Sequence, residues 1–148
     1  MKKLALAVSL LMVGSFAFTA KASRAEEDGR VIVNAEWVVE AHAAHAETFS
    51  VRGPSILRVS IVGVKNADKG FRVRVVNAQD VVSCRVAGGA CRELPSWRQD
   101  STKAFQQTEK IPPGDWSLLV ENNLNVLKRM TVRVFASVKE AVAKDLPI

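Results

Sequence analysis

The sequence predicts an all-β protein: an antiparallel β-sandwich, jelly-roll-like, of about seven or eight strands, preceded by a signal-peptide helix. Three observations lead to this fold class. Apolar residues recur at every second position in several short runs, which is typical of strands with one buried face. Gly, Pro, Asn and Asp separate these runs, as turn residues do. The 148 residues suffice for one domain after an export segment.

The first 22 residues have the composition of a cleavable secretory signal peptide. Lys2 and Lys3 form a positive end, residues 4–20 are uncharged and mostly apolar, and Ala20–Ala22 supplies small residues at the cleavage point. An uncleaved anchor is the alternative, but this run is shorter than the roughly 20 apolar residues that a spanning helix needs. We therefore expect a periplasmic or secreted bacterial protein, cleaved near Ala22, with no stable transmembrane segment after cleavage.

Cleavage leaves a single domain with short flanking segments. We expect a flexible mature N-terminus at 23–30, the β-sandwich domain at 31–138 and a C-terminal tail at 139–148. The net charge of +6 falls to +3 because three lysines leave with the signal. The remaining basic residues are spread along the chain and form no run of like charge, so we predict no nucleic-acid partner.

Four runs alternate apolar and polar residues with a period of two. They lie at residues 57–61, 71–75, 116–120 and 130–138, and β-branched residues are frequent in them. Residues 36–46 are ambiguous, because Trp37 to Val39 favours a strand and the alanines favour a short helix. We predict a strand, since no helix stop signal separates this segment from residues 47–51.

The segments between the runs contain the residues that turns need. These segments are 52–55, 66–70, 77–80, 111–114 and 121–125. Pro113 fixes φ and Gly114 accepts a positive φ, which fits a type II turn joining a strand at 105–111 to the Trp116 strand. The Asn-rich segment after Val120 is expected to open a final hairpin.

Cys84 and Cys91 are the two cysteines of the chain. In an oxidising compartment such a pair is expected to form a disulfide. A four-residue hairpin loop at Val86–Gly89 would place the two cysteines opposite each other, within bridging distance. A loop this short implies a stabilisation of about 2.5 kcal/mol in the chain-entropy model. A redox or metal thiol pair is the alternative, for which a C-x-x-C spacing would be typical.

The order of segments resembles a known group of small sandwiches. A Thr-Phe-Ser-Val strand at 48–51 precedes Gly53-Pro54, and the sequence Pro-Pro-Gly-Asp-Trp-Ser-Leu-Leu-Val-Glu-Asn occupies 112–122. This pattern is similar to the pre-peptidase C-terminal domains of bacterial secreted enzymes and, more loosely, to GOLD sandwiches. The resemblance implies a non-catalytic module for binding, adhesion or packing. The chain lacks tyrosine and an Asp-x-Asp-rich loop, so calcium binding is not carried over.

The chemistry of catalysis is weakly represented. His42 and His45 are the only histidines, and they would share a metal on a helix but point to opposite faces on a strand. Glu40 and Glu47 are the nearest further ligands. No nucleophile elbow and no phosphate-binding loop is present. We predict a protein that is not an enzyme and has no cofactor, with a small metal-dependent enzyme using the two histidines as the alternative.

The leading hypothesis is an exported, non-enzymatic binding or structural module of the bacterial envelope or medium. Its contacts are expected in a long polar loop at Arg92–Lys103, where Arg92, Trp97 and Arg98 meet an envelope protein or glycan. A Trp97 folded over the sandwich edge is the alternative. If the contact interpretation holds, Trp97→Ala weakens binding and barely changes stability.

A further alternative uses basic residues of the strands. A polyanion or membrane-surface binder would need Arg72, Arg74 and Arg133 on one contiguous face. Binding of this kind would depend strongly on salt.

Overall fold

Within residues 29–123 and 127–140, which the computed structural model describes, the chain forms eight strands. These are β1 (Arg30–Val39), β2 (Ala44–Val51), β3 (Ser55–Lys65), β4 (Phe71–Asn77), β5 (Gln99–Thr102), β6 (Ala104–Ile111), β7 (Gly114–Glu121) and β8 (Met130–Glu140). Between β4 and β5 lie three short helices: η1 (Ala78–Asp80), α2 (Val81–Cys84) and η2 (Pro95–Trp97).

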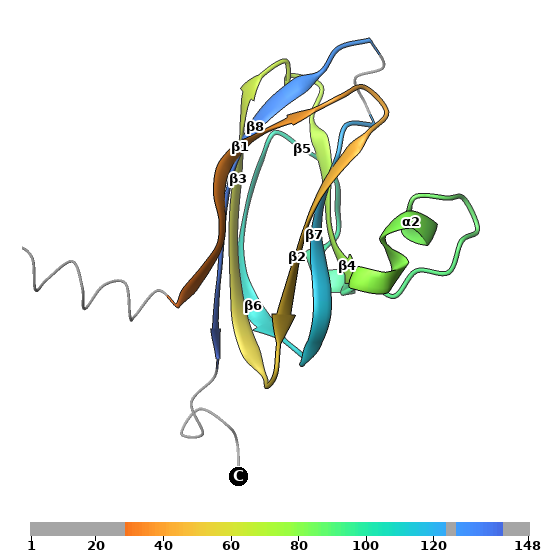
Figure 1. Ribbon diagram of the computed structural model, residues 1–148. Helices are drawn as coiled ribbons and strands as arrows, with labels where there is room; N and C mark the ends of the chain where they lie inside the picture. The colour runs from red at the N-terminus through yellow and green to blue at the C-terminus, as the bar shows by residue number, and fades with distance from the viewer. Residues whose placement is uncertain (1–28, 124–126, 141–148) are drawn as a thin grey trace, which may run out of the picture.

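The strands form two four-stranded antiparallel sheets that face each other (Figure 1). One sheet has the order β1-β8-β3-β6 and the other β2-β7-β4-β5. Apart from β4 and β5, strands that follow each other in the chain lie in different sheets. This is the eight-stranded jelly-roll topology, so the predicted sandwich is confirmed.

The predicted final hairpin is wrong, because β7 and β8 belong to different sheets. Turn residues specify that the chain reverses, but not whether it stays in the same sheet. Here Asn122 fixes the crossing: its side-chain amide donates to the carbonyl oxygens of Val39 and Lys128, both at 3.0 Å. Its backbone N–H also donates to the carbonyl of Ala43. Asn122 thus ties both sheets together at one end of the sandwich.

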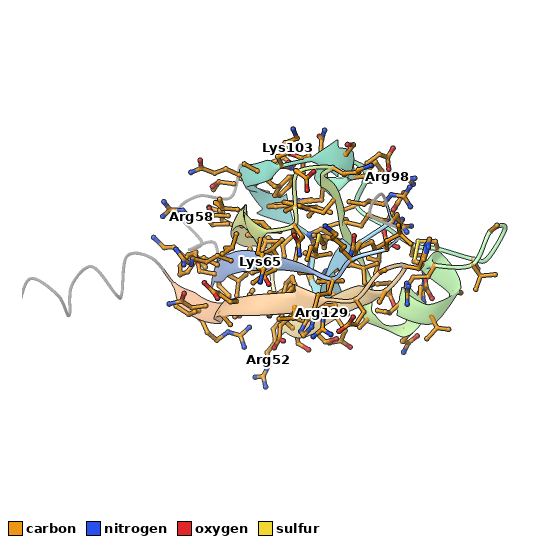
Figure 2. All side chains as sticks on the ribbon, turned by 90° about the horizontal axis from the view of Figure 1, so that it is seen from above. Arg52, Arg58, Lys65, Arg98, Lys103 and Arg129 are labelled. Carbon is orange, nitrogen blue, oxygen red and sulfur yellow. A yellow bond between two sulfur atoms is a disulfide. The ribbon has the colours of Figure 1, made fainter. Side chains whose placement is uncertain are left out.

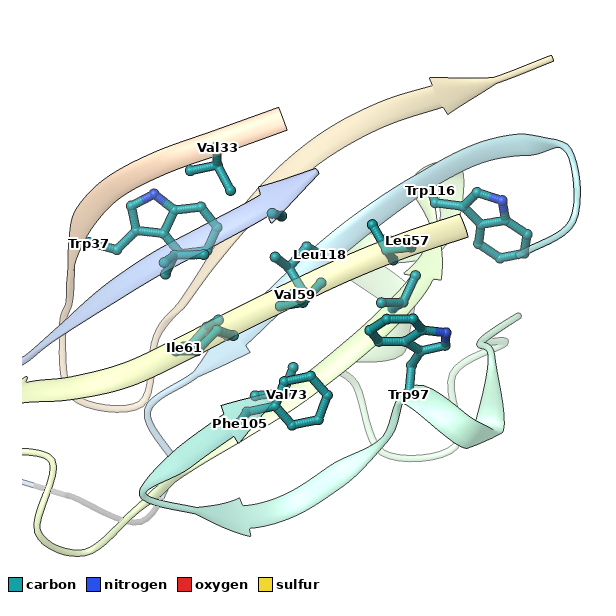
Figure 3. Close-up of a cluster of buried hydrophobic side chains, with 14 of the residues drawn as sticks. Val33, Trp37, Leu57, Val59, Ile61, Val73, Trp97, Phe105, Trp116 and Leu118 are labelled. Carbon is teal, nitrogen blue, oxygen red and sulfur yellow. The ribbon is translucent and has the colours of Figure 1, made fainter. Parts of the chain in front are cut away.

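The alternating apolar residues meet between the sheets as predicted. Leu57, Val59 and Ile61 on β3 are fully buried and face Val73 of β4 and Leu118 of β7 (Figure 3). The polar residues between them on β3 point away from this core. The alternate side chains of a strand share one face, so the core that the sequence predicted is present.

The segment 36–46 is extended, but it is not one strand. β1 ends at Val39, and a turn places His42 at a φ of 60° before β2 begins at Ala44. The two strands lie in opposite sheets. The turn was missed because it contains no Gly or Pro; a His in the left-handed region is uncommon.

The first strand begins at Arg30 and the last strand ends at Glu140. The proposed signal peptide, its cleavage site near Ala22 and residues 141–148 of the proposed tail lie outside the described residues. No helix in the described ranges has both the length and the apolar character that crossing a bilayer requires.

Candidate functional site

The chain between β4 and β5, residues 78–98, forms an insert on the outer face of the β2-β7-β4-β5 sheet. α2 and the loop after it project from the side of the sandwich that faces away from the other sheet (Figure 1). The insert buries Val76 of β4 and Leu119 of β7, whose side chains point out of the main core. β7 is thus covered on both faces, which explains why its apolar alternation is imperfect at Leu119.

The predicted disulfide is present between Cys84 and Cys91, whose Cα atoms are 4.7 Å apart. The predicted hairpin around it is wrong. Cys84 ends α2, and Cys91 lies in an irregular segment. The side-chain oxygen of Asn77 accepts from the backbone N–H of Gln79 at 3.0 Å, and this cap starts helical turns where a second strand was expected.

Arg74 anchors the insert to the sheet. Its side chain is buried on the outer face of β4, and its guanidinium makes three hydrogen bonds to the insert. Nε donates to Glu93 at 2.9 Å, Nη1 to the carbonyl oxygen of Cys84 at 2.9 Å, and Nη2 to Sγ of Cys91 at 3.1 Å. A buried charge is costly unless it is paired, so these contacts fix where the insert lies.

The anchor belongs to a wider network of charges. The buried carboxylate of Glu121 on β7 lies 3.7 Å from Arg74, 3.8 Å from Arg72 and 3.9 Å from Arg85. Arg98 bridges two further acids, at 3.0 Å from Glu93 and 2.8 Å from Asp100. The strand arginine at position 74, which alternation alone placed on a wet face, is therefore a structural residue.

The network stabilises the charged form of its carboxylates. Burial raises the pKa of Glu93, but hydrogen bonds from Arg74 and Arg98 outweigh it, so that pKa lies below its ordinary value. Hydrogen bonds from the side chain and backbone N–H of Arg92 lower the pKa of Asp80. The Arg92–Asp80 pair closes the base of the insert, with Nε 2.8 Å from the carboxylate.

Of the three residues predicted for binding, Trp97 is buried, whereas Arg92 and Arg98 are exposed. Trp97 is fully buried and packs against Phe105 at a ring-centroid distance of 6.2 Å, within the main core (Figure 3). The exposed position is therefore wrong, and the alternative of a Trp97 folded over the sandwich edge is the one present; Pro95 begins η2, which turns Trp97 inward. Arg92 and Arg98 are exposed, but their guanidinium groups pair with acids of the insert and of β5.

The two histidines lie in different surroundings. His42 is exposed in the turn after β1, and its carbonyl accepts from Arg85 at 2.9 Å. The ring of His45 on β2 stacks on Trp37, with centroids 4.1 Å apart. Within the described residues, no group of three or more His, Cys, Asp or Glu side chains is arranged to hold a metal ion.

The strand arginines do not share one face. Arg72 and Arg74 lie on β4, whereas Arg133 lies on β8 in the other sheet and pairs with Glu36 at 2.9 Å. The contiguous basic face proposed above is therefore wrong. Figure 2 shows the same spread for other cations: Arg52, Lys65 and Lys103 point in different directions around the sandwich.

The tip of the insert, residues 81–90, is an exposed feature that sequence reasoning missed. Val82 is 80% exposed and Val86 is 60% exposed. Residues 86–90 carry no charge and contain Gly88 and Gly89. The loop is closed by the disulfide, and the N–H of Gly89 donates to Val86 at 3.0 Å. The available signal was the uncharged, apolar composition of this segment between two cysteines.

Comparisons with known proteins concern the fold. No family model and no curated protein matches the chain. Among solved structures it is similar to the pre-peptidase C-terminal domain of a collagenase from Bacillus anthracis, with 16% identity and a TM-score of 0.44 over 78% of this chain and 97% of that chain. It is also similar to the Yersinia pseudotuberculosis-derived mitogen, with 12% identity and a TM-score of 0.48 over the same shares. The first of these two structures is a domain of the type that the sequence resembles.

Proposed function

We propose that this protein is an exported, non-enzymatic binding module, and that its contact surface is the projecting tip of the insert. The observation that carries the proposal is the exposure of two valines on the insert, which a buried arginine anchors. Val82 lies on α2, and Val86 lies on the loop that the disulfide closes. Large aliphatic side chains at such exposure gain free energy when a partner covers them. A loop already held in one conformation loses little entropy on binding.

The chemistry of the tip favours a protein partner with an apolar pocket. Residues 81–90 contain three valines, two alanines and two glycines, but no aromatic ring, carboxylate or side-chain amide. Sugar recognition uses aromatic faces and polar side chains that hydrogen-bond hydroxyl groups. A glycan is therefore the less favoured ligand, and its binding is an outcome that the experiment below distinguishes.

The proposed compartment is the bacterial periplasm or medium. The composition of residues 1–22 supports export, and the Cys84–Cys91 disulfide is compatible with an oxidising compartment. Mass spectrometry of protein recovered from the producing bacterium tests this part separately. We expect a chain that begins at Ser23; an intact Met1 would contradict cleavage.

Site-specific photo-crosslinking in the producing bacterium tests the contact surface. Val86 is replaced by benzoylphenylalanine, and Val62, which is 50% exposed on β3 of the opposite sheet, is replaced in the same way as the control. We expect a discrete protein adduct from position 86 and none from position 62. Adducts from both positions, none from position 86, or adducts that are carbohydrate instead of protein would contradict the proposal.

A further inference from the structure

The two sulfurs of the disulfide lie in different surroundings. Sγ of Cys91 accepts a hydrogen bond from Nη2 of Arg74 at 3.1 Å. Arg74 contacts Cys84 through the backbone carbonyl oxygen, at 2.9 Å from Nη1. Cys84 is 8% exposed, whereas Cys91 is more accessible. Cys91 is thus the more exposed of the two residues, and its sulfur contacts a cation.

The charges linked to Arg74, which contacts Cys91, come from several elements. β4 contributes Arg72 and Arg74, β7 contributes Glu121, the chain after α2 contributes Arg85, and Glu93, Arg98 and Asp100 follow Cys91 in the chain. Asp80 of η1 is paired with Arg92. Apart from the Asp80–Arg92 pair, the network contains four arginines and three acids. The buried Arg74 is the cation in contact with Sγ of Cys91. An arginine beside a cysteine sulfur is an arrangement that favours the thiolate form of a thiol.

From this arrangement we propose that Cys84 and Cys91 form a thiol–disulfide exchange site in which Cys91 is the nucleophilic thiol and Cys84 the resolving thiol. The co-reactant is a low-molecular-weight disulfide. The exchange site lies in the same insert as the binding tip but does not rest on the proposed function.

The exchange proceeds in two displacements. The Cys91 thiolate attacks one sulfur of the small disulfide, whose S–S bond breaks; a mixed disulfide forms on Cys91 and one small thiolate leaves. Cys84 then loses its proton to solvent and attacks the sulfur of Cys91. The mixed S–S bond breaks, the second small thiolate leaves, and Cys84–Cys91 is formed. The two cysteines lose two electrons, and the small disulfide is reduced to two thiols.

Arg74 is held in place independently of the sulfur. Glu93 pairs with its Nε at 2.9 Å, and Glu121 lies 3.7 Å from its Nη1. The guanidinium therefore stays beside Cys91 when the disulfide is reduced. Cys91, the more exposed cysteine and the one whose sulfur contacts Arg74, reacts with the external disulfide, and the buried Cys84 completes the exchange.

Alkylation of the reduced wild-type protein tests the assignment with an internal control. Arg74, Arg85 and Arg92 are trypsin sites, so Cys84 is recovered in peptide 75–85 and Cys91 in peptide 86–92. The reduced protein is pulsed with iodoacetamide from about pH 5 to about pH 9, a range that brackets the ordinary thiol titration. We expect the labelling profile of Cys91 to have its midpoint at least about one pH unit below that of Cys84. At about pH 6.5 this shift corresponds to a tenfold faster alkylation of Cys91. Equal profiles, or an earlier Cys84, would overturn the proposal.

Two variants extend the test. Arg74→Gln should bring the Cys91 profile to that of Cys84, whereas Arg133→Gln, on the opposite sheet, should leave the difference unchanged. With oxidised glutathione, Cys84→Ser should accumulate the adduct on Cys91 at least about tenfold faster than Cys91→Ser accumulates it on Cys84. Similar adduct rates would contradict the assigned roles, and the wild-type comparison decides if Arg74→Gln does not fold.

Discussion

Replacing Trp97 by alanine removes a fully buried indole from the main core. Truncating a buried Trp to Ala costs about 3 to 5 kcal/mol, because apolar burial is lost and a cavity remains. For a domain of this size each kcal/mol lowers Tm by roughly 4 °C, so we expect a fall of roughly 12 to 20 °C. This is the opposite of the effect expected of an exposed contact residue.

Trp97→Phe separates packing from the polar part of the indole. The buried Nε1 of Trp97 has no hydrogen-bond acceptor among the described residues. Phenylalanine keeps a ring against Phe105 and removes the unpaired N–H, which offsets part of the lost volume. We expect a cost below about 2 kcal/mol. Chemical denaturation of both variants provides the measurement; if Trp97→Ala stays within about 1 kcal/mol of wild type, or both variants are equally damaging, the buried placement is refuted.

Three further predictions concern the insert. Replacing Cys84 and Cys91 together by serine should lower the free energy of unfolding by about 2.5 kcal/mol, measured by denaturant titration, and no loss would contradict the closed-loop account. Because the pKa of Glu93 is lowered in the folded state, its carboxylate contributes stability above its ordinary pKa, and this contribution is lost as pH falls through the lowered value. Melting curves at acidic pH should therefore show a steeper loss of Tm for wild type than for Glu93→Gln; parallel curves would argue against it. A Cβ at Gly89 would collide with the carbonyl of Ser83, so Gly89→Ala should increase amide hydrogen exchange in the loop, and unchanged exchange would show that the loop adapts.

The period of two was sufficient to predict the sandwich and the residues of its core. Leu57, Val59 and Ile61 are buried because alternate side chains of a strand share one face. The same pattern does not reveal what covers the outer face. Arg74 alternates with buried valines, as a solvated residue would, and is buried because the insert that follows β4 folds back over it.

The disulfide could be predicted from the number of cysteines and the compartment that the sequence leads us to expect, but the fold around it could not. The hairpin prediction assumed that the strand pattern continues beyond Asn77, where a local side-chain cap begins helical turns instead. Similarly, composition placed Trp97 in a polar segment, yet its neighbours in space are core residues such as Phe105. The local sequence indicates the polarity of the segment around a residue. Whether that residue is buried depends on which other elements pack against it in the fold.

The binding role of the tip is tested most directly by affinity for the partner that crosslinking at position 86 captures. Calorimetry would compare wild type, the double variant Val82→Ser/Val86→Ser and the control Val62→Ser. Covering each valine contributes about 1.5 kcal/mol, so the double variant should bind at least about tenfold more weakly at an unchanged Tm, while the control binds like wild type. Equal affinity of the double variant and wild type would contradict the account.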